Sequence, residues 1–223
     1  MNKQISVIIP CYNGKKYIAE TLQIIAAESD YIGEIIVVDD KSTDGSAEYI
    51  ESLNFPKLIL YRLDSNQGIS AARNYAVAKA NYPYIAFLDA DDLWTKGRTV
   101  ALLNALETQG KPLAFGGIEH FISEDCKVNY TLPQVQTGYF ASAMLVTTEF
   151  FRKVGAFNEA FRVGEFIDWY DRARGIAAPA IVEDIVLKRR IHGANTSIME
   201  GNKNANDYLK VAREAILRKK GLL

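Results

Sequence analysis

An apolar run ends abruptly at a group of acidic residues in the stretch Tyr84-Ile85-Ala86-Phe87-Leu88-Asp89-Ala90-Asp91-Asp92. The apolar part, Tyr84 to Leu88, has the length and composition of a strand that is buried on both faces. Strands of this kind occur in parallel sheets that helices cover on both sides. The acids that follow would then lie at the carboxyl end of the strand, where open α/β sheets bind their ligands.

The same alternation of strand and helix extends through residues 1–110. Short apolar runs alternate with segments in which apolar residues recur at helical spacing. The expected strands are 5–9, 34–38, 58–62 and 84–88, and the expected helices are 17–25, 44–53, 70–80 and 99–106. Asp44 is the candidate N-cap of the second helix. This pattern predicts right-handed βαβ units and a Rossmann-like, mostly parallel sheet that is flanked by helices.

Residues 111–223 are less regular, and the turn at Gly110-Lys111-Pro112 is the nearest thing to a boundary. The expected strands are 113–122 (as one strand or two), 144–146 and 180–191, and the expected helices are 147–154, 165–174 and 207–219. No internal repeat is visible. We therefore interpret residues 1–223 as a single α/β domain with a smaller, mixed second half.

The composition narrows the classes of function. The 26 basic and 27 acidic side chains give a formal net charge of −1, so no general attraction to nucleic acid is expected. Two cysteines are too few for a disulfide framework, and two histidines argue against a histidine-rich zinc site. No signal-peptide pattern and no apolar run of about 18 residues occurs. We expect a cytoplasmic protein without a transmembrane segment. A peripheral contact with a membrane surface, through the basic end of the last helix, is a further option.

Acidic residues directly follow two of the expected strands. Asp39 and Asp40 follow the second strand, and Asp89, Asp91 and Asp92 follow the fourth. Carboxylates that are packed together repel one another unless a cation neutralises them, and oxygen ligands suit Mg²⁺ or Mn²⁺. An Asp-x-Asp pair can offer one carboxylate to the metal and the other to a ribose hydroxyl. Because such a metal usually bridges substrate phosphates, the pattern points to a nucleotide diphosphate ligand.

Acidic residues in loops also occur for purely structural reasons. Asp-Asp and Asp-Gly are common in turns and caps, but two acidic loops at one sheet edge favour a ligand-binding role over a turn role. No Gly-x-Gly-x-x-Gly follows the first strand, and no Gly-x-x-x-x-Gly-Lys-Ser/Thr occurs. The sequence therefore predicts neither a dinucleotide dehydrogenase nor a P-loop enzyme.

Four blocks of the chain, in the same order, resemble family 2 glycosyltransferases. They are Ser6-Val7-Ile8-Ile9-Pro10-Cys11-Tyr12-Asn13, Val37-Val38-Asp39-Asp40-Lys41-Ser42-Thr43-Asp44-Gly45, Asn66-Gln67-Gly68-Ile69-Ser70-Ala71-Ala72-Arg73-Asn74 and Phe87-Leu88-Asp89-Ala90-Asp91-Asp92. The resemblance implies a GT-A fold, in which residues 1–110 form the nucleotide-sugar-binding half and residues 111–223 the acceptor-binding half with the C-terminal helix. It also implies a metal-dependent, inverting sugar transfer of the hexosyltransferase type. The donor would be a nucleotide diphosphate sugar, most commonly a UDP-sugar, and the acceptor a saccharide or glycolipid. Surface polysaccharide or glycoconjugate synthesis would be the setting.

The resemblance also assigns roles to residues at the matching positions. Tyr12 and Asp39 would hold the base, and Arg73 would act at the base or the diphosphate. Asp89 would contact the ribose, and Asp91 would bind Mn²⁺ or Mg²⁺. The nucleotide-sugar site would consist of Pro10, Tyr12, Asn13, Asp39, Asp40, Asn66, Gly68, Arg73, Asp89, Ala90 and Arg190.

The second half departs from the family pattern. Family members often carry an acidic pair, Glu-Asp, ahead of a helix that ends in Arg, and here Glu165 takes the first position and Phe166 the second. Glu165 is therefore the candidate for the catalytic base, with Asp168 as the alternative. The segment Arg190-Ile191-His192-Gly193-Ala194-Asn195 resembles a family element that places His192 near the metal or the diphosphate.

The sequence is also compatible with two other functions. Phe166 in place of an acid would suit a catalytically inactive nucleotide-sugar-binding or scaffold subunit. A sugar nucleotidyltransferase on a related fold would carry a Gly-rich, basic loop after the first strand. This chain has Cys11-Tyr12-Asn13-Gly14 there, so the nucleotidyltransferase ranks lower.

Overall fold

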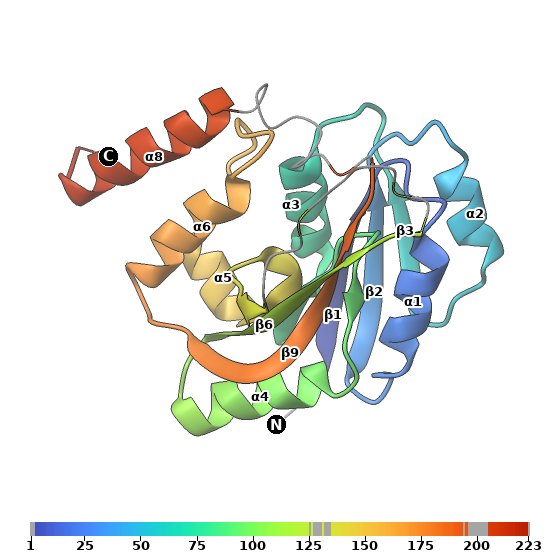
Figure 1. Cartoon of the computed structure of the whole chain (residues 1–223), viewed down its shortest axis with the longest axis horizontal. Helices are drawn as coiled ribbons and strands as arrows, with labels where there is room; N and C mark the ends of the chain where they lie inside the picture. The colour runs from blue at the N-terminus through green and yellow to red at the C-terminus, as the bar shows by residue number, and fades with distance from the viewer. Residues whose placement is uncertain are drawn as a thin grey trace.

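One continuous β-sheet runs through the residues that the computed structural model describes, which are 3–124, 126, 131, 135–193, 195 and 205–222. Helices cover both faces of this sheet, and the last helix lies at the periphery of the molecule (Figure 1). This arrangement is the α/β fold that the sequence predicts.

The first half consists of the strands and helices expected from its apolar periodicity. Its elements are β1 (Ile5–Cys11), α1 (Ile18–Ala26), β2 (Ile32–Asp39), α2 (Ser46–Ser52), β3 (Leu58–Arg62), α3 (Ile69–Lys79) and β4 (Tyr84–Phe87). Every residue of β1 is buried, because this strand lies in the middle of the sheet with helices on both faces. α1 turns Ile18, Leu22 and Ile25 into the core at helical spacing.

The start of α2 differs from the expectation. Its N-cap is Gly45, which has φ 79°, in place of Asp44. Asp44 instead accepts hydrogen bonds from the backbone N–H groups of Ser46, at 2.9 Å, and Lys15, at 3.2 Å. Glycine adopts a positive φ without a steric penalty, so the chain enters the helix one residue later than predicted.

The second half adds short strands and the remaining helices. Its elements are β5 (Leu93–Trp94), α4 (Arg98–Gln109), β6 (Leu113–Ile122), β7 (Gln136–Thr137), the 3₁₀ turn η1 (Ala141–Ala143), β8 (Met144–Thr147), α5 (Thr148–Val154), α6 (Glu165–Arg174), β9 (Ala180–Ile191) and α8 (Ala205–Lys219). Residues 113–122 form one strand, in which the register shifts at Gly117. β5 and β7 are not visible in the sequence, because strands of two residues carry no periodic signal.

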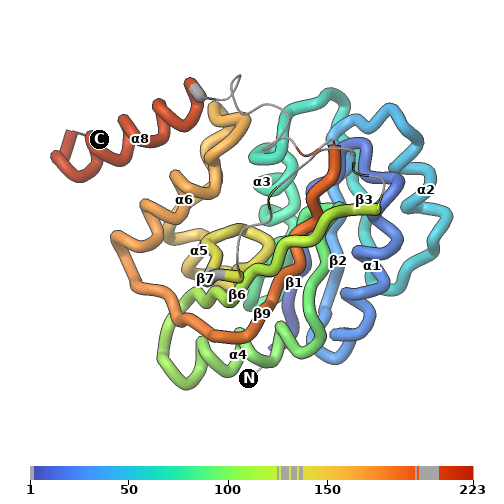
Figure 2. Tube along the Cα trace, in the orientation of Figure 1, coloured from blue at the N-terminus to red at the C-terminus, as the bar shows by residue number. Residues whose placement is uncertain are grey.

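The strand order is β3-β2-β1-β4-β8-β6-β9-β5, and β7 pairs with β6. The strands β3, β2, β1 and β4 are parallel, as predicted. β8 is antiparallel to both β4 and β6, and β5 is antiparallel to β9. β6 and β9 are parallel and run side by side in a long curve (Figure 2). The second half of the sheet is therefore mixed.

The register of the parallel strands determines where their loops lie. Cys11 of β1 pairs with Asp39 of β2, and Ile8 of β1 pairs with Phe87 of β4. The carboxyl ends of β2 and β4 therefore lie on either side of the end of β1. The two acidic loops of the sequence meet at this edge of the sheet, as expected for a ligand site in an α/β fold.

Two apolar clusters pack the helices onto the sheet. One includes residues of α1 and α4 together with Trp94, and the other includes residues of α3, α5 and α6 together with Trp169. Both tryptophans are buried, so they belong to the core. In the part of the chain that the structure describes, no helix has both the length and the apolar character that crossing a bilayer requires.

Candidate active site at the carboxyl edge of the sheet

Burial divides the five acids at the sheet edge into two groups. Asp39, Asp40 and Asp92 are buried, with at most 4% of their surface exposed. Asp89 and Asp91 keep 35% and 29% of their side chains exposed. The Asp-x-Asp pair is therefore the part of the acidic cluster that can meet a ligand directly.

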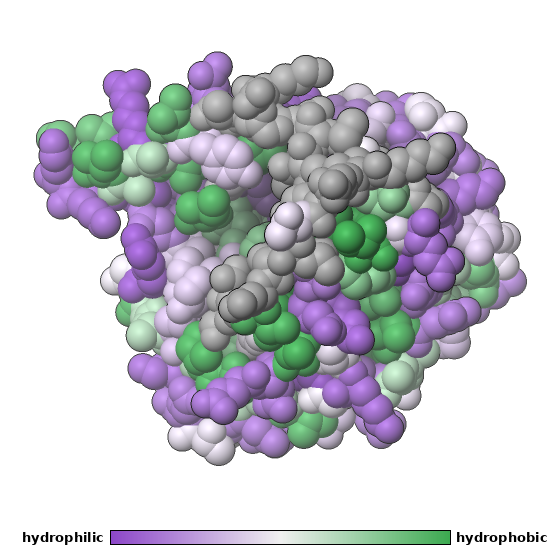
Figure 3. All heavy atoms as spheres, viewed as in Figure 1, coloured by the Kyte–Doolittle hydropathy of each residue, from purple (hydrophilic) through white to green (hydrophobic). Residues whose placement is uncertain are grey.

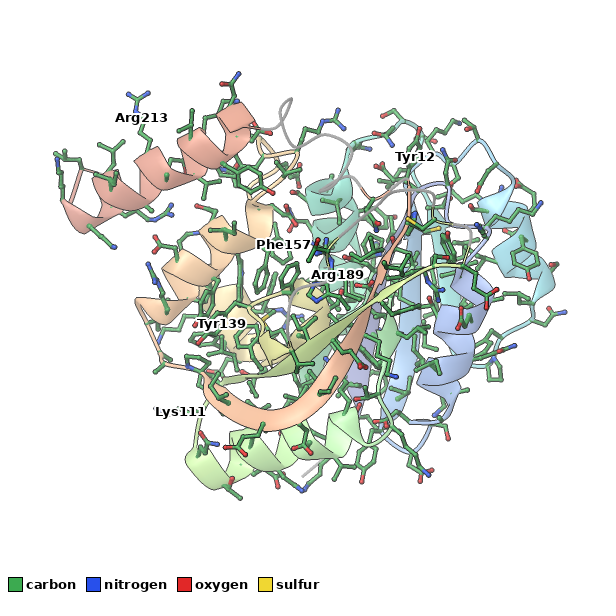
Figure 4. All side chains as sticks on the ribbon, viewed as in Figure 1. Tyr12, Lys111, Tyr139, Phe157, Arg189 and Arg213 are labelled. Atoms are coloured by element: carbon green, nitrogen blue, oxygen red, sulfur yellow. The ribbon has the colours of Figure 1, made fainter. Side chains whose placement is uncertain are left out.

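Hydrogen bonds connect the loops after β1 and β2, next to a carboxylate oxygen of Asp39 that has no partner among the described residues. Asn13 donates its N–H to Ser42 Oγ at 2.9 Å, and its Oδ1 accepts the Thr43 N–H at 2.8 Å. Asp39 Oδ2 accepts the Ser42 N–H at 3.1 Å, but its buried Oδ1 has no hydrogen-bond partner among the described residues. Tyr12 is 54% exposed at the same end of β1 (Figure 4). An exposed aromatic ring and an unpaired acceptor in neighbouring loops suit a nucleobase.

Asp40 is engaged with the backbone of the loop before α3. Its two carboxylate oxygens accept the N–H groups of Gln67 and Gly68, both at 2.7 Å, and its carbonyl accepts from Asn66 Nδ2 at 3.1 Å. Pro10 lies buried within β1. These predicted site residues therefore shape the loops around the site, and the contacts of Asp40 leave its carboxylate turned away from solvent.

Arg73 on α3 links the two halves of the chain. Its Nη2 donates to Asp89 Oδ1 and its Nη1 donates to Glu165 Oε1, both at 2.6 Å. Burial by itself would lower the pKa of Arg73, but the Asp89 and Glu165 carboxylates outweigh burial and raise that pKa above its ordinary value. The resemblance implied a contact with the base or diphosphate, whereas the structure places the guanidinium between two carboxylates. Charge-assisted hydrogen bonds of this kind fix the orientation of both partners.

The two candidates for the catalytic base face different surroundings. Glu165 is the first residue of α6 and contacts Arg73. Asp168 is 2% exposed, accepts from Arg172 Nε at 3.1 Å, and its Oδ1 lies 2.8 Å from Arg218 Nη1 on α8. Because Asp168 is paired with Arg172 of α6 and Arg218 of α8, Glu165 is the one of the two that joins the group at the sheet edge.

Asp91 and His192 meet although 101 positions separate them in the sequence. His192 Nε2 lies 2.8 Å from Asp91 Oδ2, and the ring of Tyr17 lies 4.8 Å from the imidazole. Asn195 holds the turn that positions His192: its Oδ1 accepts the His192 N–H at 2.5 Å, and its Nδ2 donates to the Arg190 carbonyl at 3.1 Å. The predicted metal ligands are thus brought together by β9 and its turn.

Arg190 supports the acidic loop from β9. Its Nε donates to the carbonyl of Asp91 at 2.8 Å, its Nη2 to Glu20 at 2.5 Å, and its backbone N–H to Asp92 Oδ1 at 2.9 Å. Burial, with the neighbouring charges of Asp91 and Asp89, raises the pKa of Asp92 well above its ordinary value. The structure therefore gives Arg190 the task of holding the loop that carries the Asp-x-Asp pair.

Two hydroxyl groups that the sequence does not predict also hold this loop. Ser142 Oγ, in η1, accepts the Asp89 N–H at 3.2 Å. Thr21 Oγ1, on α1, donates to the carbonyls of Ala90 at 3.0 Å and Asp92 at 3.1 Å. Single hydroxyl residues have no distinctive spacing, so no sequence pattern predicts their role. Asn195, by contrast, stands in the segment that the resemblance singled out.

The donor set suits a divalent ion that is shared with a phosphate ligand. Among the described residues, no group of three or more His, Cys, Asp or Glu side chains is placed to hold a metal. Asp91 and His192 offer one carboxylate and one imidazole, which are both ligands for Mn²⁺. Mg²⁺ and Mn²⁺ sites of nucleotide enzymes commonly use one or two protein ligands and complete their coordination with water and phosphate oxygens. The pair fits that type of site.

The fold and the site together define an α/β protein of the GT-A class, with the Asp-x-Asp pair exposed where β4 ends. The chain belongs to glycosyl transferase family 2, whose family model matches residues 6–163. This result confirms the family that the four sequence blocks indicated.

Individual relatives extend the likeness over most of the chain. An uncharacterized glycosyltransferase from Rickettsia conorii is 28% identical over 90% of this chain, and the chain spans 36% of that relative's length. The Escherichia coli protein WfaP, named a UDP-Glc:alpha-D-GlcNAc-diphosphoundecaprenol beta-1,3-glucosyltransferase, is 25% identical over 95% of this chain and 84% of its own. The S. aureus protein TarS (residues 1–349, with UDP-GlcNAc) superimposes with a TM-score of 0.71 over 86% of this chain and 60% of that one. Its identity of 21% makes it a likeness of fold.

Proposed function

We propose that this chain transfers a sugar from a nucleotide diphosphate donor to a hydroxyl group of a saccharide acceptor, with inversion at the anomeric carbon. The observation that carries the proposal is the link that Arg73 makes between Asp89 and Glu165. It joins the partly exposed carboxylate of Asp89, in residues 1–110, to a carboxylate at the start of α6. A sugar bound between these two carboxylates would lie within reach of both.

A UDP-sugar is the donor that the site supports best. Uracil carries an N–H donor that the unpaired Oδ1 of Asp39 would accept, and the ring of Tyr12 offers a stacking surface. Asp89 would then meet the ribose. TarS was solved with UDP-GlcNAc and WfaP is named for UDP-Glc, and both names favour a UDP-sugar here.

Asp91 and His192 are the residues that would hold Mn²⁺ or Mg²⁺ in this proposal. When bound, the ion supplies positive charge that stabilises the departing diphosphate by several kcal/mol. The chain itself contributes the placement of the two ligands. Arg190 holds the loop of Asp91, and Asn195 holds the turn of His192.

Glu165 would take the proton of the acceptor hydroxyl. As that oxygen bonds to the anomeric carbon, the bond from this carbon to the diphosphate breaks, and the electron pair leaves with the nucleotide. A single displacement of this kind inverts the configuration and needs one base, by analogy with inverting glycosidases. Arg73 would orient the carboxylate, and the proton transfer is worth roughly 10²–10⁴ in rate.

Donor hydrolysis tests the proposal without knowledge of the acceptor. We expect the chain to release UDP slowly from a UDP-sugar in the presence of Mn²⁺, and Asp91→Ala to abolish both the release and its dependence on Mn²⁺. Asp30→Ala, which removes an exposed carboxylate in the turn before β2, is the matched control. Full activity of Asp91→Ala in the presence of a chelator would refute the metal role.

The setting that we propose is the synthesis of a surface polysaccharide or glycoconjugate, with a saccharide or glycolipid as acceptor. WfaP is named for a diphosphoundecaprenol-linked acceptor, which is the basis for including glycolipids. The alternative is a subunit that binds the donor without turning it over, since Phe166 occupies the place of a second acid. Phe166 packs in the aromatic core against Trp169 and Tyr170. Tight UDP-sugar binding without hydrolysis or transfer would favour this alternative.

A further inference from the structure

α8 is fastened to α6 by its inner face. Val211 is buried there, and a Cβ on Gly164, the residue that precedes α6, would lie 3.3 Å from its side chain. Arg218 forms ion pairs with Asp168 at 2.8 Å and with Asp171 at 3.2 Å. These contacts define the orientation of the helix, with one face turned outward.

The acidic side chains of α8 are on this inner side. Asp207 Oδ2 accepts the Arg162 N–H at 3.0 Å, and 14% of its side chain is exposed. Glu214 lies 3.8 Å from Arg218 and is 35% exposed. Asp207 also pairs with Lys210 of the same helix at 3.0 Å, so both carboxylates of the helix have a cationic partner.

The outer face combines apolar and basic residues. Leu209 and Ile216 are 67% and 53% exposed, and their separation of seven positions places both on one face of the helix. Arg213, Lys219 and Lys220 are exposed beside them and have no ion-pair partner among the described residues. Figure 4 shows Arg213 pointing away from the body of the molecule. Hydrophobic and hydrophilic groups alternate along the outside of this helix in Figure 3.

We propose that this outer face docks on an anionic lipid surface. Leu209 and Ile216 would enter the boundary between headgroups and acyl chains, and Arg213, Lys219 and Lys220 would lie at the lipid phosphates. A helix with an apolar stripe between cations binds an interface in this way, and each cation near an anionic surface contributes about 1 kcal/mol. On α8 both acids and the paired Arg218 lie on the inner side, whereas Arg213, Lys219 and Lys220 are exposed on the outer side, and this separation of charge is what selects a negatively charged partner.

A second copy of the chain suits this face less well than an anionic lipid surface does. In a symmetric dimer the same patch meets itself, so the three cations of each copy would face those of the other without a counter-charge. The proposed docking is also independent of the transfer reaction, because none of these five residues contacts the carboxylates at the sheet edge. Vesicle binding can therefore fail or succeed regardless of the proposed function.

Co-sedimentation of the whole chain with vesicles tests the inference. We expect binding to phosphatidylcholine vesicles that contain phosphatidylglycerol, little binding to phosphatidylcholine alone, and weaker binding at high salt. The triple variant Arg213→Gln/Lys219→Gln/Lys220→Gln should bind anionic vesicles roughly a hundredfold more weakly, at about fivefold for each cation. Leu209→Gln/Ile216→Gln should lose more than about tenfold through the apolar contribution.

Matched controls separate docking from folding. Arg152→Gln/Lys153→Gln on α5 removes exposed cations elsewhere, and Val100→Gln on α4 removes an exposed apolar side chain. Both should bind vesicles like the wild type, and all variants should keep its thermal midpoint. Equal binding to neutral vesicles, or undiminished binding by the triple variant, would overturn the proposal. So would a dimer in solution that Leu209→Gln/Ile216→Gln dissociates, because the apolar stripe would then belong to a second copy.

Discussion

Arg73 directs two carboxylates at once, and this makes it the residue on which the geometry of the site depends. Its planar guanidinium reaches Asp89, 16 positions away, and Glu165, 92 positions away. A lysine has one ammonium group and no fork, so it cannot span both carboxylates in the same way. The role of Arg73 that follows from these contacts is the positioning of groups that meet the substrate.

The first prediction concerns the base. Glu165→Gln should lower the turnover number by roughly 10²–10⁴, because the amide cannot take a proton from the acceptor. Donor affinity should change little, since the amide oxygen can still accept from Arg73. Steady-state rates and donor titration would measure the two effects separately. A matched Asp168→Asn variant should keep more of the turnover and lose stability, because it weakens the pairs with Arg172 and Arg218. The reverse ranking of the two variants would make Asp168 the base.

The second prediction concerns acid stability. Burial lowers the pKa of His120 on β6, and the positive charge of Arg189 lowers it further. Because the folded pKa lies below the unfolded value of about 6.5, the stability that this neutral imidazole provides is present above that pH. It is lost as the pH falls further, because the unfolded chain binds the proton more readily. His120→Gln should therefore flatten the fall of the thermal midpoint below about pH 6.5. Parallel curves for the two proteins would contradict the assignment.

At the scale of the elements, periodicity explains which parts of the fold could be predicted. β1, β2 and β4 read as short, mostly apolar runs because helices cover both of their faces. α6 and α8 show apolar residues at helical spacing. The shift of the α2 cap from Asp44 to Gly45 depends on one backbone angle, which a sequence does not reveal.

The site was predictable where it follows directly from a strand end. Asp39, Asp89 and Asp91 lie at the sheet edge because parallel strands bring their loops together. The contact of Asp91 with His192 comes from the pairing of β5 with β9, for which local periodicity contains no signal. The same holds for Asp168, whose partner Arg218 lies on a distant helix.

The third prediction concerns the hydrogen bonds that connect the end of β2 to the loop before α3. Asp40 accepts the N–H groups of both Gln67 and Gly68, and the single amide oxygen of Asp40→Asn cannot satisfy both. A buried N–H without a partner costs about 1–3 kcal/mol, so the free energy of unfolding should fall by that amount. Denaturant unfolding would measure it, with the exposed Asp30→Asn as control. Unchanged stability combined with lost donor affinity would show that Asp40 serves the ligand instead.

At the scale of the whole molecule, two pairs in the site join the two halves of the chain. Asp91 comes from the loop after β4 and His192 from the end of β9, while Arg73 on α3 meets Glu165 on α6. A ligand that contacts both members of a pair therefore stabilises the two halves together. Binding to the native state alone should raise the stability of the entire fold.

The last prediction follows from the fact that Asp91 and His192 supply only two of the ligands that a divalent ion needs. Two protein ligands hold a divalent ion weakly until the phosphates of a nucleotide add theirs, so Mn²⁺ alone should barely change the thermal midpoint. UDP and Mn²⁺ together, at about a hundred times their joint dissociation constant, should add about 2.7 kcal/mol, or roughly 5–10 °C for a chain of this size. Asp91→Ala should remove the increment due to Mn²⁺ and leave any effect of UDP alone, while the control Asp30→Ala should behave as the wild type. A shift with Mn²⁺ that is equally large without UDP would mean that the protein supplies a complete metal site. The protein would then bind the ion in the absence of the donor.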